Sequence, residues 1–171
     1  NAYTMPAYAH AAVEVLEAMG VGKTAVLGWS LGGHVGLEML QIFPGVVGLM
    51  ITGTPPVGQS AEAILAGFTQ HPDIALVGKR DFTPDDVKSF GRTILGSAAT
   101  PFFEDMIRRT DGRAREIMFG SLFTGGVSDQ KKIAESLRGA RERAISSKKI
   151  ACHQDSGTQA APTCRSPRPS S

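Results

Sequence analysis

The stretch TAVLGWSLGG, residues 24–33, decides the fold predicted for this chain. Its first four residues are uncharged and do not alternate with polar ones, which predicts a short parallel strand buried on both faces. Residues 28–32 have the pattern G-x-S-x-G. Apolar residues at helical spacing follow over residues 31–43, and Pro44 closes that helix. The pattern therefore lies at a turn from strand to helix.

Ser30 stands at the centre of that turn, where this pattern is typical of a nucleophile elbow. A Ser in a tight, strained turn projects its Oγ above the sheet edge, and Gly28 and Gly32 let the chain approach itself without Cβ clashes. The positive end of the following helix faces negative charge that develops there. The backbone N–H of Leu31 is placed to stabilise an oxyanion. The alternative is a loop that only joins a strand to a helix.

The flanking segments complete a helix–strand–helix–strand order over residues 1–55. Thr4 is a capping residue, Pro6 suits a first helical turn, and Gly20 suits the left-handed position that ends a helix. A second uncharged strand is predicted over residues 46–52, before the turn signal of residues 53–56. Short connections of this kind predict a parallel sheet with right-handed crossovers.

The middle of the chain has helical patterns and no convincing strand. Thr83 and Pro84 begin one helix, and two more are predicted over residues 101–109 and 113–122, with Asp111 as a cap. Ser128 is the expected cap of a further helix that runs to about residue 137. Helices inserted after a strand are typical of a lid over an α/β core.

The last part of the chain changes character. The 171 residues carry a net charge of +2, but residues 1–136 hold 11 Lys and Arg against 14 Asp and Glu, and residues 137–171 hold 7 against 2. Beyond Leu137 the only Val, Ile, Leu, Met or Phe residues are Ile145 and Ile150. This composition predicts disorder from about residue 145. The basic charge belongs to this tail, so we expect no nucleic-acid partner, and no apolar run is long enough to span a membrane.

Residues 1–136 resemble the middle of an α/β-hydrolase of the AB-hydrolase-1 type. The resemblance implies a partial α/β-hydrolase core over residues 1–56, a helical cap over 57–136, and a basic tail of low complexity over 137–171. These residues carry the resemblance: Tyr8-Ala9, Leu16, Met19-Gly20-Val21, Lys23, Val26-Leu27-Gly28-Trp29-Ser30-Leu31-Gly32-Gly33-His34, Phe43-Pro44 and Gly53-Thr54-Pro55-Pro56.

The same resemblance implies a serine hydrolase. Ser30 is the expected nucleophile, and Leu31 is the expected backbone donor to the oxyanion. The substrate is an ester-like small molecule, no cofactor or metal is implied, and the expected location is cytoplasmic. Trp29 either lines the substrate pocket or packs under the cap. Four aromatic residues of the cap favour an apolar substrate: Phe68, Phe90, Phe102 and Phe103.

The chain departs from the family at both ends. The strands that precede this region are not found, and neither are the acid and the His that complete a Ser–acid–His triad. Beyond residue 137 no further strand is predicted. We therefore expect a chain that is truncated at both ends, with a shifted reading frame or a false gene end, and at most weakly active. The alternatives are an inactive remnant and a non-catalytic ligand-binding module.

Other polar residues have ordinary structural interpretations. His34 is expected to make a packing or polar contact, and the first turn of a helix explains Asp85 and Asp86. His153 has the right place in chain order, but the predicted tail gives it no core. His10 and His71 are expected on the surface, and the four arginines of the cap are expected on a solvated face: Arg108, Arg109, Arg113 and Arg115. Cys152 and Cys164 lack a zinc spacing. Asp129 and Asp155 flank His153 in the sequence.

Overall fold

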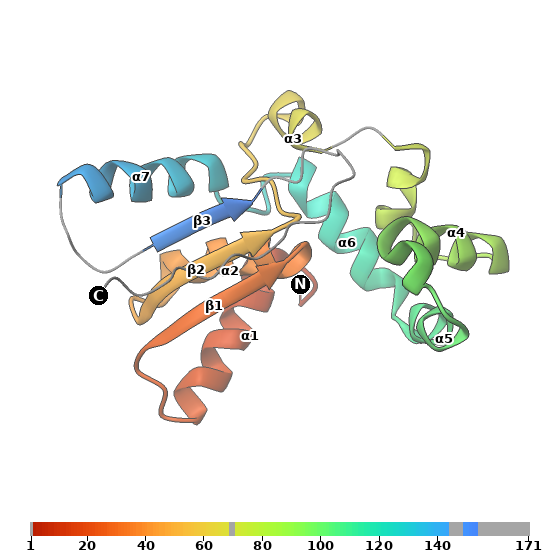
Figure 1. Ribbon diagram of the computed structural model, residues 1–171, viewed down its shortest axis with the longest axis horizontal. Helices are drawn as coiled ribbons and strands as arrows, with labels where there is room; N and C mark the ends of the chain where they lie inside the picture. Colours follow the sequence, from red (N-terminus) through yellow and green to blue (C-terminus); the bar gives the residue numbers. More distant parts are fainter. Residues whose placement is uncertain (1, 69–70, 144–148, 154–171) are drawn as a thin grey trace, which may run out of the picture.

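The computed structural model describes residues 2–68, 71–143 and 149–153. Three parallel strands form one sheet: β1 (Thr24–Trp29), β2 (Val46–Thr52) and β3 (Lys149–His153), in the order β1-β2-β3. Helices α1 (Met5–Ala18) and α2 (Leu31–Ile42) lie behind this sheet in Figure 1, and α7 (Gln130–Arg143) lies beside β3. The described core is therefore larger than the two-stranded unit predicted from the sequence.

The first helix and the first turn follow their local signals. The Thr4 hydroxyl accepts a hydrogen bond from the Ala7 N–H, and Gly20 has a φ of 70° directly after the helix. One side of α1 packs on α2 and β2 around Ala9, Val13, Met39 and Val46. This packing holds α2 against α1 and β2, and α2 begins directly after the turn at the end of β1.

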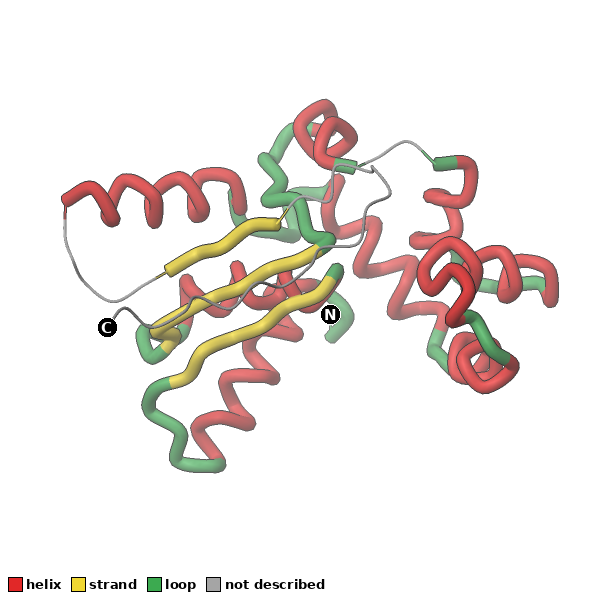
Figure 2. Tube along the Cα trace, in the orientation of Figure 1, coloured by secondary structure: helices red, strands yellow, loops and turns green. Residues whose placement is uncertain are grey.

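Residues 61–123 of the region predicted as a cap, called the cap below, form a helical layer to one side of the sheet. Residues 130–136 of that predicted region begin α7 and pack with the sheet instead. Figure 2 shows no strand in the cap, as predicted for this part of the chain. A capping box of Thr83 and Asp86 begins α4, and the Asp111 side chain accepts a hydrogen bond from the Arg113 N–H at the start of α6. The elements are α3 (Ala61–Gly67), the 3₁₀ segment η1 (Pro72–Gly78), α4 (Pro84–Leu95), the 3₁₀ segment η2 (Gly96–Ala98), α5 (Pro101–Arg109) and α6 (Gly112–Phe123).

One hydrophobic cluster joins the cap to the core. Met5 of α1 packs with Ile64 of α3, Leu122 of α6 and the buried Val57 and Val127. Leu31, the first residue of α2, packs against the same cluster. The base of the cap is thus anchored beside the turn that holds Ser30.

Two predictions about the end of the chain are wrong. Residues 149–153 form β3, where the sequence predicts a disordered tail without a strand. The other residues of that predicted disorder, 145–148 and 154–171, lie outside the described residues. The cap of α7 is Asp129 and not Ser128, because the Asp129 carboxylate accepts a hydrogen bond from the Lys132 N–H at 3.1 Å. Ser128 is used elsewhere, as described below.

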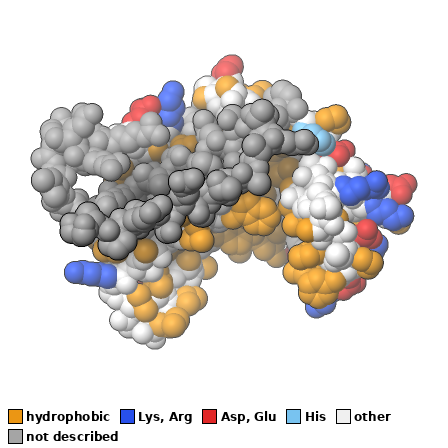
Figure 3. Space-filling model, viewed as in Figure 1, with side chains coloured by type: hydrophobic (Ala, Val, Ile, Leu, Met, Phe, Trp, Pro, Cys, Tyr) orange, Lys and Arg blue, Asp and Glu red, His pale blue; other side chains and the backbone are white. Residues whose placement is uncertain are grey.

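The prediction that the strand at residues 24–27 is buried on both faces is also wrong for β1, and β2 is likewise buried on one face only. Val46, Leu49 and Ile51 are buried under the helices, but Leu27, Trp29 and Met50 on the other face are 72%, 58% and 50% exposed. Strand residues alternate between faces, so these side chains lie on a bare face of the sheet, which no described helix covers. Figure 3 shows that hydrophobic side chains reach the surface on both core and cap, while charges of both signs gather on the cap.

Candidate active site

Ser30 has a strained backbone between β1 and α2. Its φ is 51° and its ψ is −121°, and no other described residue apart from Gly has a positive φ. Such a conformation costs about 1–3 kcal/mol and persists only where the surroundings enforce it. The sequence predicts unusual angles at this residue, and the structure confirms them. The Ser30 side chain is exposed, and it makes no capping hydrogen bond to α2.

Hydrogen bonds hold both peptide groups of Ser30. The Ser30 N–H donates to the Thr52 carbonyl at 2.9 Å. The Ser30 carbonyl accepts one hydrogen bond from the Gly33 N–H at 2.9 Å and another from the Thr54 hydroxyl at 2.7 Å. Both lone pairs of this carbonyl are therefore used.

The glycines of the motif differ in what they do. A Cβ added at Gly28 would lie 2.5 Å from the Gly32 carbonyl oxygen and from the Gly33 nitrogen, so only Gly fits there. A Cβ at Gly33 would lie 2.7 Å from the Thr54 Cβ. Among the described residues, no heavy atom lies within 4 Å of a Cβ added at Gly32. The prediction that the turn has no room for a Cβ is thus confirmed at Gly28 and wrong at Gly32. Gly33 is the second position of the turn where a Cβ would clash.

Leu31 is the first residue of α2, and its backbone N–H lies in the first helical turn. The N–H groups of a first turn lack intrahelical partners and carry the positive end of the helix dipole. Trp29 precedes Ser30 on the bare face of the sheet and lies beside Gly53. Because its side chain is more than half exposed, it does not pack under the described part of the cap.

A buried polar network behind the elbow was missed by the sequence analysis. His34 Nδ1 lies 2.7 Å from Gln130 Oε1, and Gln130 Nε2 donates to Glu38 Oε1 at 3.0 Å. The Ser128 hydroxyl donates to Glu38 Oε2 at 2.7 Å, and its N–H donates to Glu38 Oε1 at 3.1 Å. Glu38 and His34 are one turn apart on α2, whose other residues except Gln41 are apolar or Gly, and this spacing is the only sequence signal for such a pair.

This network determines the state of His34. The Gln130 amide gives its N–H to Glu38 and turns its oxygen to His34, so Nδ1 carries the proton and donates. Burial lowers the pKa of His34, against opposing effects of the Gln130 hydrogen bond and the Glu38 charge. The expectation that His34 makes a polar contact agrees with this position.

The backbone register places His153 at the same edge of the sheet as Ser30. His153 pairs with Thr52, and Thr52 pairs with Trp29, so the carboxyl ends of all three strands are level. Neighbouring strands lie about 4.8 Å apart, which puts the His153 backbone about 10 Å from that of Trp29. The sequence does not favour His153 as a site residue, because the sequence predicts no strand at β3. Asp155 and Cys164 lie outside the described residues.

The other titratable candidates have local structural partners. His71 caps η1 by accepting the Asp73 N–H at 3.1 Å, and His10 is exposed on α1. Hydrogen bonds from Lys79 and Thr83 lower the pKa of Asp86 to about 2. In residues 2–68, 71–143 and 149–153 no group of three or more His, Cys, Asp or Glu residues is placed to hold a metal ion. No described helix is both long and apolar enough to cross a membrane.

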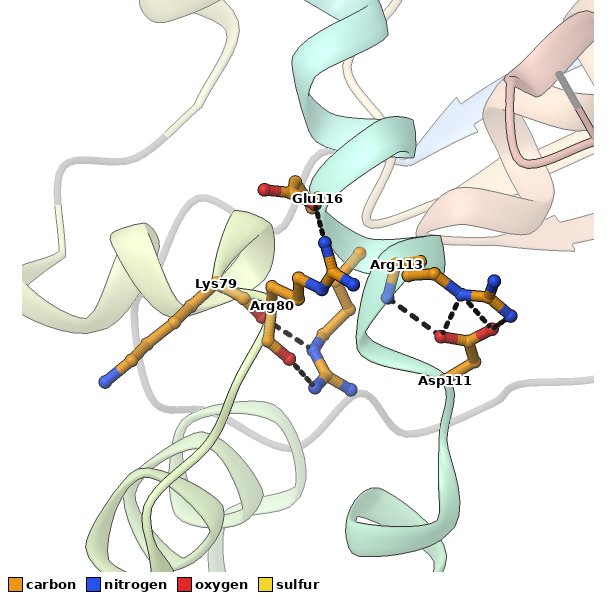
Figure 4. Close-up of polar contacts among 6 residues, drawn as sticks. Lys79, Arg80, Asp111, Arg113 and Glu116 are labelled. Carbon is orange, nitrogen blue, oxygen red and sulfur yellow. Dashed lines mark hydrogen bonds and ion pairs between the residues drawn. The ribbon is translucent and has the colours of Figure 1, made fainter.

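The cap arginines are engaged within the protein. Figure 4 shows Arg113 on the Asp111 carboxylate and Arg80 near Glu116. The nitrogen–oxygen distances of these ion pairs are 2.6 Å and 3.6 Å. Arg115 donates to the carbonyls of Lys79 and Arg80, and its guanidinium lies over the Phe82 ring. The Tyr3 hydroxyl donates to Asp111 at 2.8 Å and so ties the start of the chain to the cap. Arg108 and Arg109 pair with the acids one turn earlier.

Solved structures of an N-acyl homoserine lactonase, AidH, are similar to this chain. The structure with N-butanoyl homoserine is 44% identical, with a TM-score of 0.73, over 77% of this chain and 47% of that one. A variant with Ser replaced by Gly, solved with N-hexanoyl homoserine lactone, is 43% identical, with a TM-score of 0.73, over 77% and 48%. A variant with Glu replaced by Gly, solved with N-hexanoyl homoserine, is 40% identical, with a TM-score of 0.76, over 88% and 51%.

The described part of the chain is similar in structure to an α/β-hydrolase, because the lactonase is a member of that family. The chain spans about half the length of these lactonase structures. No family model and no curated protein matches the chain.

Proposed function

We propose that this chain is a serine hydrolase of the AB-hydrolase-1 type that acts on an ester-like bond, with a lactone as the favoured substrate class. The observation that carries the proposal is the strained backbone of Ser30 at the N-terminus of α2. Backbone strain of this kind is concentrated at functional sites. The exposed Ser30 side chain is accessible to a substrate.

The proposed reaction is acyl transfer to water. Ser30 Oγ attacks the carbonyl carbon of the lactone while a base takes its proton. The oxygen of the tetrahedral intermediate accepts a hydrogen bond from the Leu31 N–H, supported by the positive end of the α2 dipole. The ring C–O bond then breaks, the protonated base gives its proton to the leaving oxygen, and an acyl-enzyme remains. Water then hydrolyses the ester at Ser30 and releases the ring-opened hydroxy acid.

The lactonase structures support a lactone substrate. AidH was solved with a ring-opened acyl homoserine, whereas its Ser-to-Gly variant was solved with the intact lactone. This difference is what a serine nucleophile predicts for that protein. We carry the role to Ser30 because Ser30 occupies the strand-to-helix turn of this chain.

Phe68 supports an apolar substrate group better than the other three candidate phenylalanines. Its ring centroid lies 6.2 Å from that of His34, and the side chain packs against the cluster that Leu31 joins. Phe90 contacts Phe82, and Phe102 contacts Phe103, both in the outer part of the cap. We propose that an acyl chain of the substrate runs toward Phe68. A cytoplasmic location stays a prediction.

A non-catalytic ligand-binding protein is the second candidate. It is favoured by one observation: among residues 2–68 and 71–137, whose side chains the structure describes, no His or carboxylate makes a hydrogen bond to Ser30 Oγ. Loss of a triad base costs several orders of magnitude in rate in serine proteases. We therefore predict that the chain of residues 1–171 is at most weakly active.

The test is hydrolysis of N-hexanoyl homoserine lactone and of a short activated ester by the purified chain. We expect slow ring opening that Ser30→Ala abolishes and that Ser97→Ala, at an exposed cap position, leaves unchanged. An equal rate for Ser30→Ala would contradict the proposal. Thermal stabilisation by the lactone without any turnover would favour the binding protein.

A further inference from the structure

Thr54 lies against the elbow although it is 24 residues away in sequence. Its hydroxyl donates to the Ser30 carbonyl at 2.7 Å and lies 3.2 Å from the Thr52 carbonyl. The residue is only 8% exposed, so this hydroxyl is shielded from competing water. The sequence identifies residues 53–56 only as a turn.

The turn after β2 explains how Thr54 reaches Ser30. Gly53 has a φ of 60°, which reverses the chain directly after the strand and brings Thr54 back over the end of β1. Gly33 leaves the room that Thr54 fills, since a Cβ there would lie 2.8 Å from the Thr54 methyl carbon. Gly33 and Thr54 are therefore complementary in shape.

The contacts of Ser30 divide into two kinds. The N–H of Ser30 continues the ladder between β1 and β2, and any residue would form that bond. The bond from Thr54 is made by a side chain to the carbonyl whose direction is set by the unusual ψ of Ser30. Removal of this hydroxyl leaves the strained peptide with one partner fewer, while an isosteric Val keeps the packing on Gly33.

We propose that Thr54 is a positioning residue for Ser30: its hydroxyl holds the Ser30 carbonyl and thereby keeps the elbow in the conformation that presents Oγ. The effect on reactivity rests on the proposed function, because it requires Ser30 to be the nucleophile. The effect on backbone conformation does not. The hydroxyl, and not the volume of the side chain, carries the role.

The experiment compares Thr54→Val and Thr54→Ser with the full chain, and Thr24→Val serves as a matched control. Thr24 lies in β1, and its hydroxyl bonds to the carbonyl of its own neighbour, Ala25, at the far end of that strand. Crystal structures report the φ of Ser30, amide hydrogen exchange reports the Gly33 N–H, and a fluorophosphonate probe reports the reactivity of Ser30.

For Thr54→Val we expect Ser30 to leave the positive-φ region and the Gly33 amide to exchange roughly tenfold faster, the effect of one lost hydrogen bond. Labelling of Ser30 slows by about the same factor at saturating probe. Thr54→Ser restores all three readouts to within about threefold. The control variant matches the unmodified chain.

An unchanged φ and unchanged exchange in Thr54→Val overturn the inference, whatever the labelling shows. If the unmodified chain is not labelled at all, the proposed function fails, and the altered φ and exchange still establish the role of Thr54. If Thr54→Val does not fold, Thr54→Ala replaces it, because the smaller side chain makes no contact closer than Thr does. A Thr54→Ser variant as impaired as Thr54→Ala also overturns the inference.

Discussion

At Gly28, the backbones of β1 and α2 pass so closely that no methyl group fits between them. Three backbone atoms of Gly32 and Gly33 lie 2.5 Å from the place of the missing Cβ. Backbone atoms cannot move aside as the end of a flexible side chain can, so the turn tolerates no larger residue at this position. This close packing and the hydrogen bond from Thr54 to the Ser30 carbonyl act together on the strained turn.

We predict that Gly28→Ala lowers the free energy of unfolding by about 2–3 kcal/mol, the usual effect of forcing an extra carbon into packed structure. Gly32→Ala is the matched control from the same motif. Because the space around Gly32 is open, we expect it to change stability by less than about 0.5 kcal/mol. Urea unfolding measures both, and equal effects of the two substitutions would contradict the account of the turn.

At the scale of elements, α2 connects the elbow to the rest of the molecule. Its apolar side packs on β2 and α7 around Leu37, Leu49 and Ile133, and its buried Glu38 binds the residues that lead into α7. Both carboxylate oxygens of Glu38 accept hydrogen bonds. A buried carboxylate with all its partners present holds two elements in one arrangement.

Replacement of Glu38 by Ala should lower the free energy of unfolding by about 2–3 kcal/mol, because the Ser128 and Gln130 donors lose their acceptor in a buried site. Glu17→Ala, at an exposed position of α1, is the control and should be nearly neutral. Thermal unfolding distinguishes them. A loss no greater than that of Glu17→Ala would show that the network contributes nothing.

A pH dependence of stability is expected from His34. Its pKa in the folded protein is below the ordinary value of 6.5 because the ring is buried. The unfolded chain therefore binds the proton more readily, and the contribution of His34 to stability is complete above pH 6.5 and lost as the pH falls below it.

Urea unfolding between about pH 7 and pH 5 measures this dependence. We predict that the free energy of unfolding falls with pH in the unmodified chain and falls less steeply in His34→Gln. His10→Asn, at an exposed position on α1, should keep the slope of the unmodified chain. An identical slope for His34→Gln would exclude His34 as its source.

The sequence predicts the elements whose signals are local. The helices of the cap, α1, α2 and the first two strands each have a capping residue, a turn residue or an apolar pattern within their own length. β3 has no such pattern, and its formation depends on the pairing edge that β2 offers. Long-range pairing of this kind leaves little trace in a short segment.

The candidate site also has a local part that the sequence predicts and long-range contacts that it does not. The G-x-S-x-G pattern predicts the strained Ser30, because the turn is made of adjacent residues. The hydroxyl of Thr54 and the carboxylate of Glu38 reach their partners over 24 and 90 residues, so no local pattern reveals them. His153 was dismissed for the same reason, since its position follows from β3.

At the scale of the whole molecule, the sheet has helices on one face only within the described residues. Leu27 and Met50 are exposed on neighbouring strands of the other face, and parallel sheets are normally covered on both faces. Apolar side chains that adjoin one another in this way favour association with other proteins or with further copies of the chain.

We expect the purified chain to self-associate at micromolar concentration, and we expect Leu27→Lys combined with Met50→Lys to reduce this association. Met19→Lys is the control, because Met19 is also exposed but lies at the end of α1, away from the sheet face. Sedimentation velocity measures the outcome. Equal association of the double variant and the control would show that the bare face is not responsible.

The central claim is that Ser30 is a nucleophile prepared by its turn. Its most direct test is to label the purified chain with a fluorophosphonate and to locate the adduct by mass spectrometry of its peptides. The account predicts an adduct on Ser30 that forms slowly, in preference to every other serine of the chain, and that is absent in Ser30→Ala. A chain in which Ser30 reacts no faster than the exposed Ser97 would contradict it.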